Sequence, residues 1–192
     1  MTQNTSASKS ALTTKSLVYC ALLTALMAAS AWISIPLGPV PFTMQTFVMT
    51  FGLLILKPRE FLFSVALYLL LGALGLPVFS GMRGGFAMLL GPTGGFLWGF
   101  FVAALLSYGA RAALGNAAKK LPLVVMDSVV ATLYTILIFV CGVFQLMIVA
   151  NLDFAAALAA GVIPFIFTGI LKLAGAVILV QALRKTLAKL MY

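Results

Sequence analysis

The chain has 192 residues, 64% of them hydrophobic and only 8% charged, whereas a soluble domain carries about 25% charged residues. This composition excludes an ordinary soluble protein and predicts an all-α integral membrane protein built as one compact bundle. The chain has no histidine and only three acidic residues, so the usual general acids and bases are nearly absent. We therefore expect no catalytic site.

A net charge of +9 would suit nucleic acid or anionic lipid as a partner, but the placement of the basic residues described below accounts for most of it. We expect a lipid bilayer around the chain and no nucleic acid. Cys20 and Cys141 lie inside apolar runs, where cysteine is typical of a small buried residue, and they predict no metal site. No G-x-x-x-x-G-K-S/T motif is present, so any ATP consumed must be bound by another polypeptide. We expect no cofactor.

The chain divides into a polar tail and a membrane domain. Residues 1–16 are rich in Ser and Thr and predict a cytoplasmic N-terminal tail, whereas residues 17–192 predict a single membrane domain. Six apolar runs, separated by Pro, Gly and charged turns, are expected to span a hydrocarbon core of about 30 Å. The six expected helices are Leu17–Ile35, Thr43–Leu56, Phe61–Leu76, Gly94–Ala112, Leu121–Val149 and Ala155–Ala182.

The basic residues indicate which side of the membrane each loop faces. Six spans place both termini on one side, and the tails and loops on that side hold all but two of the twelve Lys and Arg residues, at positions 9, 15, 57, 59, 111, 119, 120, 184, 185 and 189. By the positive-inside rule, this side is cytoplasmic. The pattern predicts a multi-pass protein of a bacterial-type plasma membrane with both termini in the cytoplasm.

The two remaining cations need another explanation. Lys172 lies within the sixth span, where a lysine costs about 2.5 to 3.5 kcal/mol on translocon scales, which favours a functional role; the alternative is snorkelling to an interface. Arg83 lies in the loop on the opposite side, flanked by Gly81, Gly84 and Gly85. These glycines would let a ligand approach the backbone closely, although a loop arginine can also simply solvate a surface.

The glycine-rich stretch Gly75–Gly99 is the centre of the predicted site. It holds eight glycines and two prolines, and irregular backbone at bilayer depth is tolerated only where it is buried in protein or lines a cavity. We expect it to form the lid and wall of a binding site. Gly91 and Gly95 stand at the expected N-terminus of the fourth span, where backbone amides can receive an anion or a carbonyl. With Gly99 they also form a small-residue stripe for close helix packing.

Polar and aromatic residues extend this site. Gln45, at the start of the second span, can donate to and accept from a ligand, or brace the loop, and Thr43 is expected to cap the helix. Aromatic residues near the outer face would wall a ligand or anchor the chain at the membrane interface. Asp127, near the cytoplasmic end of the fifth span, is expected to be a structural or coupling residue. The aromatic residues concerned are Phe79, Phe86, Phe96 and Trp98.

Three segments resemble the BioY family, the biotin-capturing substrate component, or S component, of energy-coupling-factor (ECF) transporters. They are PVPFTMQTF at Pro39–Phe47; YLLLGALGLPVFSG at Tyr68–Gly81, continued by GG and by LLGPTGG up to Gly95; and Pro164, Phe165 and Lys172 in the sixth span. The resemblance implies a six-helix protein that takes biotin from the outer face. It also implies partner chains, namely a transmembrane coupling subunit and two cytosolic ATPase subunits.

The residues and the resemblance together give the expected sites. We expect the biotin pocket under the loops Pro36–Phe42 and Pro77–Pro92. S components are similar in carrying an A-x-x-x-A surface on the first helix for docking to the coupling subunit, and Ala21 and Ala25 match it. With Ala29 they form a small-residue stripe, for which packing inside the bundle is the alternative. The expected pocket residues are Thr43, Gln45, Phe79, Ser80, Arg83, Gly84, Gly85, Phe86, Gly91, Thr93, Gly94, Thr168, Gly169 and Lys172.

One position departs from the family pattern. The family usually reads P-F-x-P-G-D-x-x-K, and Gly169 stands where the aspartate would be. An aspartate there could offset the charge of Lys172 one helical turn away, so its absence predicts an unpaired lysine and keeps open an S component for another small organic acid or vitamin. A membrane enzyme or assembly factor is the alternative from another class, and the scarcity of His, Asp and Glu argues against it.

Overall fold

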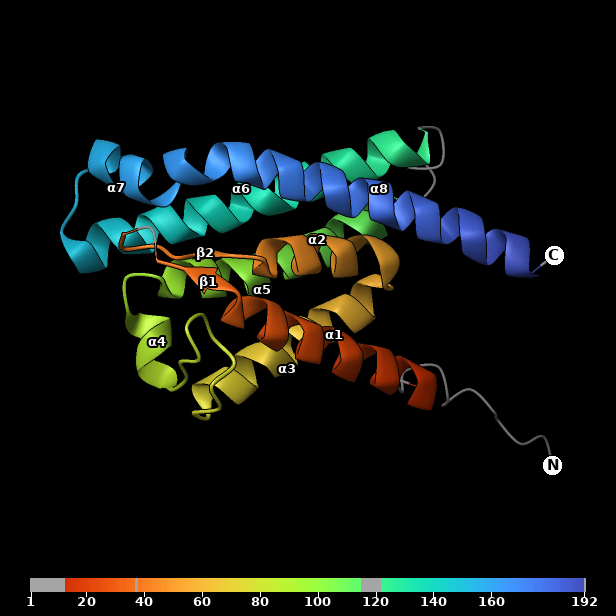
Figure 1. The fold of residues 1–192 in the computed structure, drawn as a ribbon, viewed down its shortest axis with the longest axis horizontal. Helices are drawn as coiled ribbons and strands as arrows, with labels where there is room; N and C mark the ends of the chain where they lie inside the picture. Colours follow the sequence, from red (N-terminus) through yellow and green to blue (C-terminus); the bar gives the residue numbers. More distant parts are fainter. Residues whose placement is uncertain (1–12, 37, 115–121, 192) are drawn as a thin grey trace, which may run out of the picture.

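The computed structural model of the chain, shown in Figure 1, describes residues 13–36, 38–114 and 122–191. The fold is predominantly helical, as the composition predicts. In chain order the elements are α1 Thr14–Trp32, β1 Ser34–Ile35, β2 Phe42–Thr43, α2 Gln45–Ile55, α3 Pro58–Ala73, α4 Phe86–Leu90, α5 Gly94–Leu114, α6 Leu123–Ala150, α7 Phe154–Gly161, the 3-10 turn η2 Ile163–Phe165, and α8 Ile166–Met191.

Three helical segments are long and apolar enough to cross a membrane, namely Thr14–Trp32, Leu123–Ala150 and Phe154–Thr186. Gln45–Ile55 and Gly94–Gly109 are shorter apolar helices. The predicted tail overlaps the first of these segments, because α1 already begins at Thr14. The hydroxyl of Thr13 accepts a hydrogen bond from the backbone N–H of Ser16, and such a cap allows a helix to start. The rest of the predicted tail, residues 1–12, lies outside the described residues, as does the basic loop at 115–121.

The last predicted span, Ala155–Ala182, is not one continuous helix. α7 ends at Gly161, η2 contains Pro164, and α8 begins at Ile166. Proline has no backbone N–H and its ring clashes in a helix interior, so the chain turns at this point before α8 begins. A second difference is α4, a short helix within the glycine-rich stretch where we expected only irregular backbone.

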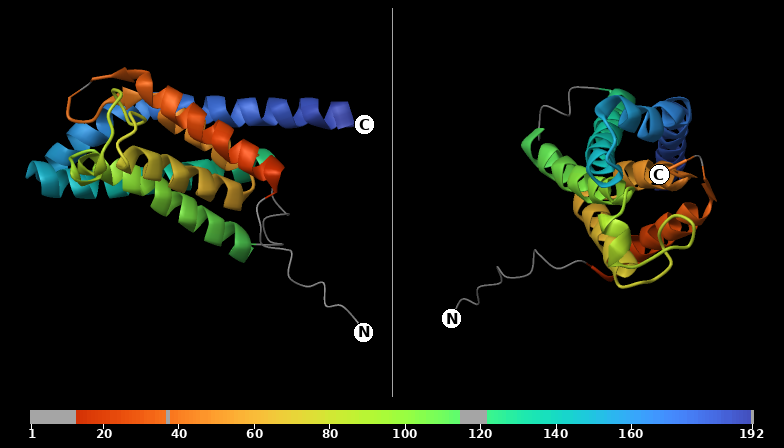
Figure 2. Two further views of the ribbon diagram at one scale, coloured as in Figure 1. Left: turned by 90° about the horizontal axis from the view of Figure 1, so that it is seen from below. Right: turned by 90° about the vertical axis from the view of Figure 1, so that its left-hand side faces the viewer.

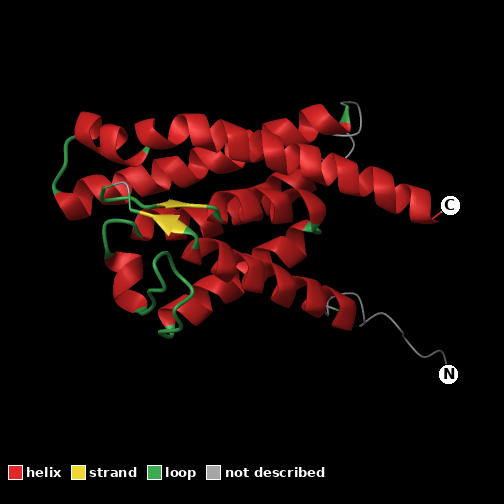
Figure 3. Cartoon of the chain, viewed as in Figure 1, coloured by secondary structure: helices red, strands yellow, loops and turns green. Residues whose placement is uncertain are grey.

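A small antiparallel hairpin lies at one end of the bundle. Ser34 of β1 pairs with Thr43 of β2, and Ile35 pairs with Phe42. Figure 3 shows the hairpin in yellow, at the end of the bundle opposite the start of α1 and the end of α8. The glycine-rich loop and α4 lie at the same end (Figure 1). We call this the hairpin end.

Helix α2 packs against α1, α6 and α8, while α3 packs against α1 and α5, and α5 against α6. The views in Figure 2 show how these helices surround one another. Two glycines allow α5 to approach α6 closely. A Cβ atom on Gly95 would lie 2.4 Å from the carbonyl oxygen of Cys141, and one on Gly99 would lie 3.0 Å from the Cα of Ile138. The small-residue interpretation is therefore correct for these two positions.

Helix α1 has one face turned into the bundle and one turned away from it. On the inner face, the Ser16 hydroxyl donates a hydrogen bond of 2.6 Å to the buried carboxylate of Glu60 on α3. On the other side, Ala21, Ala25 and Ala29 are all exposed. The alanine stripe therefore does not pack inside the bundle.

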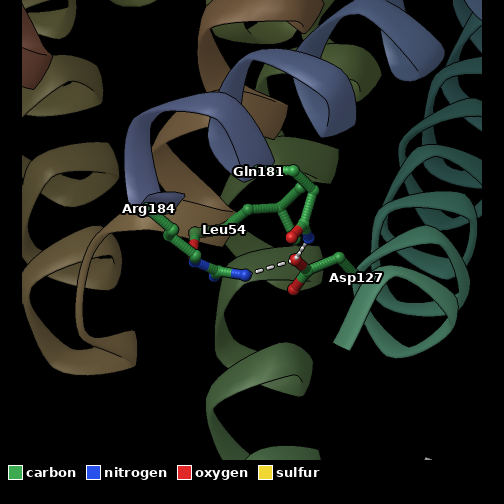
Figure 4. A network of polar contacts seen from close by, with 4 residues as sticks. All are labelled: Leu54, Asp127, Gln181 and Arg184. Carbon is green, nitrogen blue, oxygen red and sulfur yellow. Dashed lines mark hydrogen bonds and ion pairs between the residues drawn. The ribbon is translucent and has the colours of Figure 1, made fainter. Parts of the chain in front are cut away.

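A polar cluster joins three helices, as Figure 4 shows. Asp127 of α6 is buried and accepts hydrogen bonds from two residues of α8, Arg184 and Gln181, the second at 2.7 Å. Arg184 also donates to the carbonyl of Leu54, one of the last carbonyls of α2 that have no partner within the helix. Asp127 and Arg184 together therefore tie α6, α8 and α2 to one another.

Candidate ligand-binding site

A cavity of about 110 Å³ lies toward the hairpin end. Residues of the hairpin, the glycine-rich loop and helices α2, α5, α6 and α8 form its wall, which is mostly apolar and aromatic. Its lining residues are Val40, Pro41, Thr43, Gln45, Thr46, Thr50, Phe79, Ser80, Met88, Thr93, Phe96, Leu97, Phe100, Thr135, Ile138, Phe139, Phe165, Gly169, Lys172 and Leu173. The predicted site residues among them are Thr43, Gln45, Phe79, Ser80, Thr93, Gly169 and Lys172.

Lys172 reaches from α8 to the start of α2. Its Nζ donates a hydrogen bond of 2.6 Å to the carbonyl of Thr43 and lies 3.4 Å from the hydroxyl oxygen of Thr46. The same atom lies 3.8 Å from the centre of the Phe42 ring, within the range of a cation–π interaction. The predicted unpaired lysine therefore has partners, but all three are neutral. No acidic side chain is among the described residues that line the cavity.

Gln45 is the first residue of α2 and is only 4% exposed. Its Nε2 makes no hydrogen bond of normal geometry with the described residues, although the Tyr68 hydroxyl group lies close enough to interact with this amide. A buried donor without an acceptor destabilises a protein by about 1 to 3 kcal/mol. A ligand atom that accepts a hydrogen bond from the Gln45 amide would remove this cost and so favour binding. The predicted helix cap by Thr43 is wrong, because Met44 occupies the cap position and no side chain accepts there. Thr43 instead belongs to β2 and holds Lys172 through its carbonyl.

The glycine-rich loop is held against the bundle by hydrogen bonds to its backbone and side chains. The Tyr68 hydroxyl donates to the carbonyl of Val78 at 2.9 Å, and the Trp32 indole donates to the carbonyl of Pro77 at 2.7 Å. The hydroxyl groups of Ser80 and Ser34 are hydrogen-bonded at 2.7 Å. This anchoring places Phe79 and Ser80 in the cavity wall, where the sequence predicted them.

Four other predicted residues of this loop do not line the cavity. The side chain of Arg83 is exposed, and its backbone pairs with that of Phe79. Gly84 lies where a Cβ atom would meet the Leu76 carbonyl oxygen at 2.2 Å. Gly85 has a φ of +100° at the start of α4, a conformation that favours glycine, and Phe86 is 58% exposed. The two glycines thus have structural roles that explain their presence without a ligand.

Around the start of α5, Thr93 lines the cavity, but Gly91 and Gly94 do not. The Gly91 carbonyl accepts a hydrogen bond of 2.8 Å from the side-chain amide of Gln145 on α6, which also donates to the Leu89 carbonyl at 2.9 Å. A Cβ atom on Gly94 would meet the Leu89 carbonyl oxygen at 2.1 Å. Backbone packing therefore explains Gly94, whereas a Cβ atom on Gly91 would make only an ordinary contact, at 3.5 Å from the Ala87 carbonyl oxygen. Sequence reasoning missed Gln145, although an amide within an apolar span was a visible signal.

The two remaining predicted residues lie on α8. Gly169 lines the cavity, and a Cβ atom there would have no heavy atom within 4 Å. Thr168 does not line this cavity; its hydroxyl donates to the Phe165 carbonyl at 3.3 Å. It borders a separate open groove on the outside of the bundle, which it shares with Phe42 and Lys172.

Two further polar residues of the cavity wall were not predicted, namely Thr50 and Thr135. The hydroxyl groups of Thr50 and Thr135 each donate to the carbonyl four residues earlier at 2.8 Å, so their oxygens can still accept a hydrogen bond from a ligand. Their position inside apolar helices was the only signal in the sequence. Among the aromatic candidates, Phe96 lines the cavity, whereas Trp98 does not and donates to the Leu89 carbonyl at 3.1 Å.

Comparison with known proteins identifies related chains. The model of the BioY family matches residues 2–189. The chain is 38% identical over 173 residues to the biotin transporter BioY of Thermotoga maritima, an alignment that covers 89% of this chain and 96% of the relative. It is 39% identical over 158 residues to the biotin transporter BioY2 of Lactococcus lactis subsp. cremoris, covering 82% and 83% of the two chains. The resemblance predicted from the sequence is confirmed.

The fold is also similar to a solved structure. The crystal structure of the S-component for biotin from an ECF-type ABC transporter matches with a TM-score of 0.80 at 27% sequence identity. The match covers 91% of this chain and 95% of the other.

Proposed function

Because this chain belongs to the BioY family, we propose that it is the biotin-binding S component of an ECF-type transporter and mediates high-affinity biotin uptake. The observation that carries this proposal is the cavity at the hairpin end. Its apolar and aromatic wall suits the sulfur-containing ring and alkyl chain of biotin. The unpartnered amide N–H group of Gln45 suits the ureido carbonyl, and Lys172 brings a positive charge to the same cavity.

The proposed topology has six spans, namely α1, α2, α3, α5, α6, and α7 together with α8. The start of α1, the turn between α2 and α3, and the end of α8 lie at the same end of the bundle (Figure 1). These segments carry Lys15, Lys57, Arg59, Arg184 and Lys185, so the positive-inside rule supports a cytoplasmic location for this end. The cavity then opens toward the outer face of a cell membrane.

The proposed partners are a transmembrane coupling subunit and two cytosolic ATPase subunits. The similarity to an S-component of an ECF-type transporter supports an energising module, and the sequence has no phosphate-binding loop of its own. The exposed faces of Ala21 and Ala25 support docking of the coupling subunit on α1, since small residues allow helices to approach closely in a membrane.

Mass spectrometry of the protein purified from cells grown with biotin tests this proposal. We expect biotin in the extract of the denatured protein, at a level that approaches one molecule per chain, and none in a mock purification. A different small acid at that level would favour the second candidate, an S component for another organic acid or vitamin. The empty space beside Gly169 favours that candidate, because it could hold a ligand group that biotin lacks.

A further inference from the structure

The segment that follows helix α1 connects two walls of the cavity. One wall includes Thr43 of β2, and the other includes Phe79 and Ser80 of the glycine-rich loop. Ser34 of β1 contacts both walls. Its backbone pairs with that of Thr43, and its hydroxyl group is hydrogen-bonded to that of Ser80, with 2.7 Å between the two oxygens. A single residue therefore joins two walls that lie far apart in the sequence.

Trp32 makes a second connection to the same loop. It is the last residue of α1, and its indole N–H donates a hydrogen bond of 2.7 Å to the carbonyl of Pro77. Neither Trp32 nor Ser34 is among the described residues that line the cavity, so contact with a ligand does not explain these bonds. We call the Ser34–Ser80 and Trp32–Pro77 hydrogen bonds the clasp.

The two sides of the glycine-rich loop differ in how firmly they are held. Tyr68 of α3 is fully buried, and its hydroxyl group donates to the Val78 carbonyl at 2.9 Å, so a break of this bond would leave polar groups buried without a partner. Trp32, by contrast, is 47% exposed and Ser34 is half-buried. Water can replace either partner when the clasp breaks, so the loop can separate from the α1–β1 side while it stays attached to α3.

We propose that the ligand enters and leaves the cavity between β2 and the glycine-rich loop, and that Ser34 and Trp32 are the positioning residues that close this route. This inference rests on the proposed function, because biotin is the ligand used in the test. The clasp joins protein groups only, so it stabilises the closed form equally with and without a ligand. A change that favours opening equally in both cases alters the rates of binding and release but not the affinity.

The first test measures the association and dissociation rates of radiolabelled biotin on the purified full chain. Ser34→Ala and Trp32→Phe each remove one bond of the clasp, and each should raise both rates by the same factor, about two- to tenfold. The dissociation constant should stay within about twofold of the wild-type value. Ser30→Ala is the matched control on α1, because the Ser30 hydroxyl donates to the Met27 carbonyl within the helix, and it should change neither rate.

The second test closes the route with a covalent bond. The hydroxyl oxygens of Ser34 and Ser80 are close enough for cysteines at both positions to form a disulfide. We expect the double variant Ser34→Cys/Ser80→Cys, loaded with biotin and then oxidised, to release biotin about tenfold or more slowly, and reduction to restore the rate. Peptide mapping distinguishes this disulfide from one with Cys20 or Cys141, and Ser34→Cys alone is the control.

The outcomes separate this inference from the proposed function. Unchanged rates in both Ser34→Ala and Trp32→Phe, or a rise in the dissociation rate alone, would overturn the inference and leave the proposed function intact. Exchange of biotin by the disulfide-bonded double variant as fast as by the reduced protein would show that the route lies elsewhere. Failure of wild type to bind biotin would overturn the proposed function itself, and this inference with it.

Discussion

At the residue scale, the two cations outside the predicted cytoplasmic loops have different environments. Lys172 lines the cavity, whereas the Arg83 side chain is exposed and does not. We predict that Lys172→Ala weakens biotin binding by about 2 to 5 kcal/mol, the range for removing one partner of a buried charge pair. Arg83→Ala should cost less, because water replaces an exposed guanidinium. Calorimetric titration of both variants checks this, and a larger loss for Arg83→Ala would contradict the assignment.

The buried amide of Gln45 gives a prediction that separates binding from stability. Gln45→Met removes a donor that has no partner, so the ligand-free protein should be as stable as wild type or more stable, while biotin affinity falls about tenfold. Gln145→Met is the matched control. It removes an amide that satisfies two carbonyls, and it should lower the free energy of unfolding by about 1 to 3 kcal/mol. Unfolding in detergent and biotin titration measure the two effects, and a destabilised Gln45→Met would count against an unsatisfied donor.

The residues that the sequence predicted correctly as cavity-lining are mainly those with a chemical reason to be there, such as Lys172 and Gln45. The roles of the glycines were harder to predict, because a glycine indicates an unusual backbone conformation or a close contact but not whether a ligand or the protein itself requires it. Gly84 and Gly94 are required by contacts with backbone carbonyls, which no local pattern reveals. Thr135 was missed for the opposite reason, since a single threonine in an apolar helix does not indicate which face it occupies.

At the element scale, the exposed alanine stripe makes α1 the proposed docking helix. Ala25→Leu places a bulky side chain on this exposed face, so we predict weaker association with the coupling subunit and nearly unchanged biotin affinity. Co-purification with a tagged coupling subunit measures association, and titration measures affinity. Ala29→Ser retains a small side chain and serves as the control. A loss of biotin binding with association intact would show that the stripe supports the bundle instead.

The polar cluster that joins α2, α6 and α8 predicts a coupled pair of substitutions. Asp127→Ala leaves Arg184 without its acidic partner and should lower the free energy of unfolding by about 2 kcal/mol, less than for a fully buried pair because Arg184 is partly exposed. In the double variant Asp127→Ala/Arg184→Ala, the loss in free energy of unfolding should be about 1 kcal/mol smaller than the sum of the losses in the two single variants. Unfolding titrations in detergent measure the cycle, and strict additivity would mean that the two side chains do not interact.

Long helices were predictable because their apolar runs leave no alternative in a bilayer. The hairpin and α4 were not predictable, because both are too short to show a clear hydrophobic periodicity. The hairpin strands Ser34–Ile35 and Phe42–Thr43 form only two residue pairs. The break before α8 could have been placed from Pro164, but sequence alone does not distinguish a proline that starts a helix from one that divides it.

At the scale of the whole molecule, the proposed function is that of a binding protein that depends on other chains for energy. The cavity at the hairpin end, the polar cluster of Asp127 and Arg184, and the exposed alanine face of α1 are formed by different residues of one bundle. Binding should therefore need neither ATP nor a partner, whereas uptake should need both.

Equilibrium titration of the purified chain with biotin, without ATP or partner subunits, is the decisive test of the proposed function. We predict saturable binding of one biotin per chain that survives removal of all nucleotide and that unlabelled biotin competes away. Absence of saturable binding by a folded, monodisperse protein freed of any copurified ligand would contradict it.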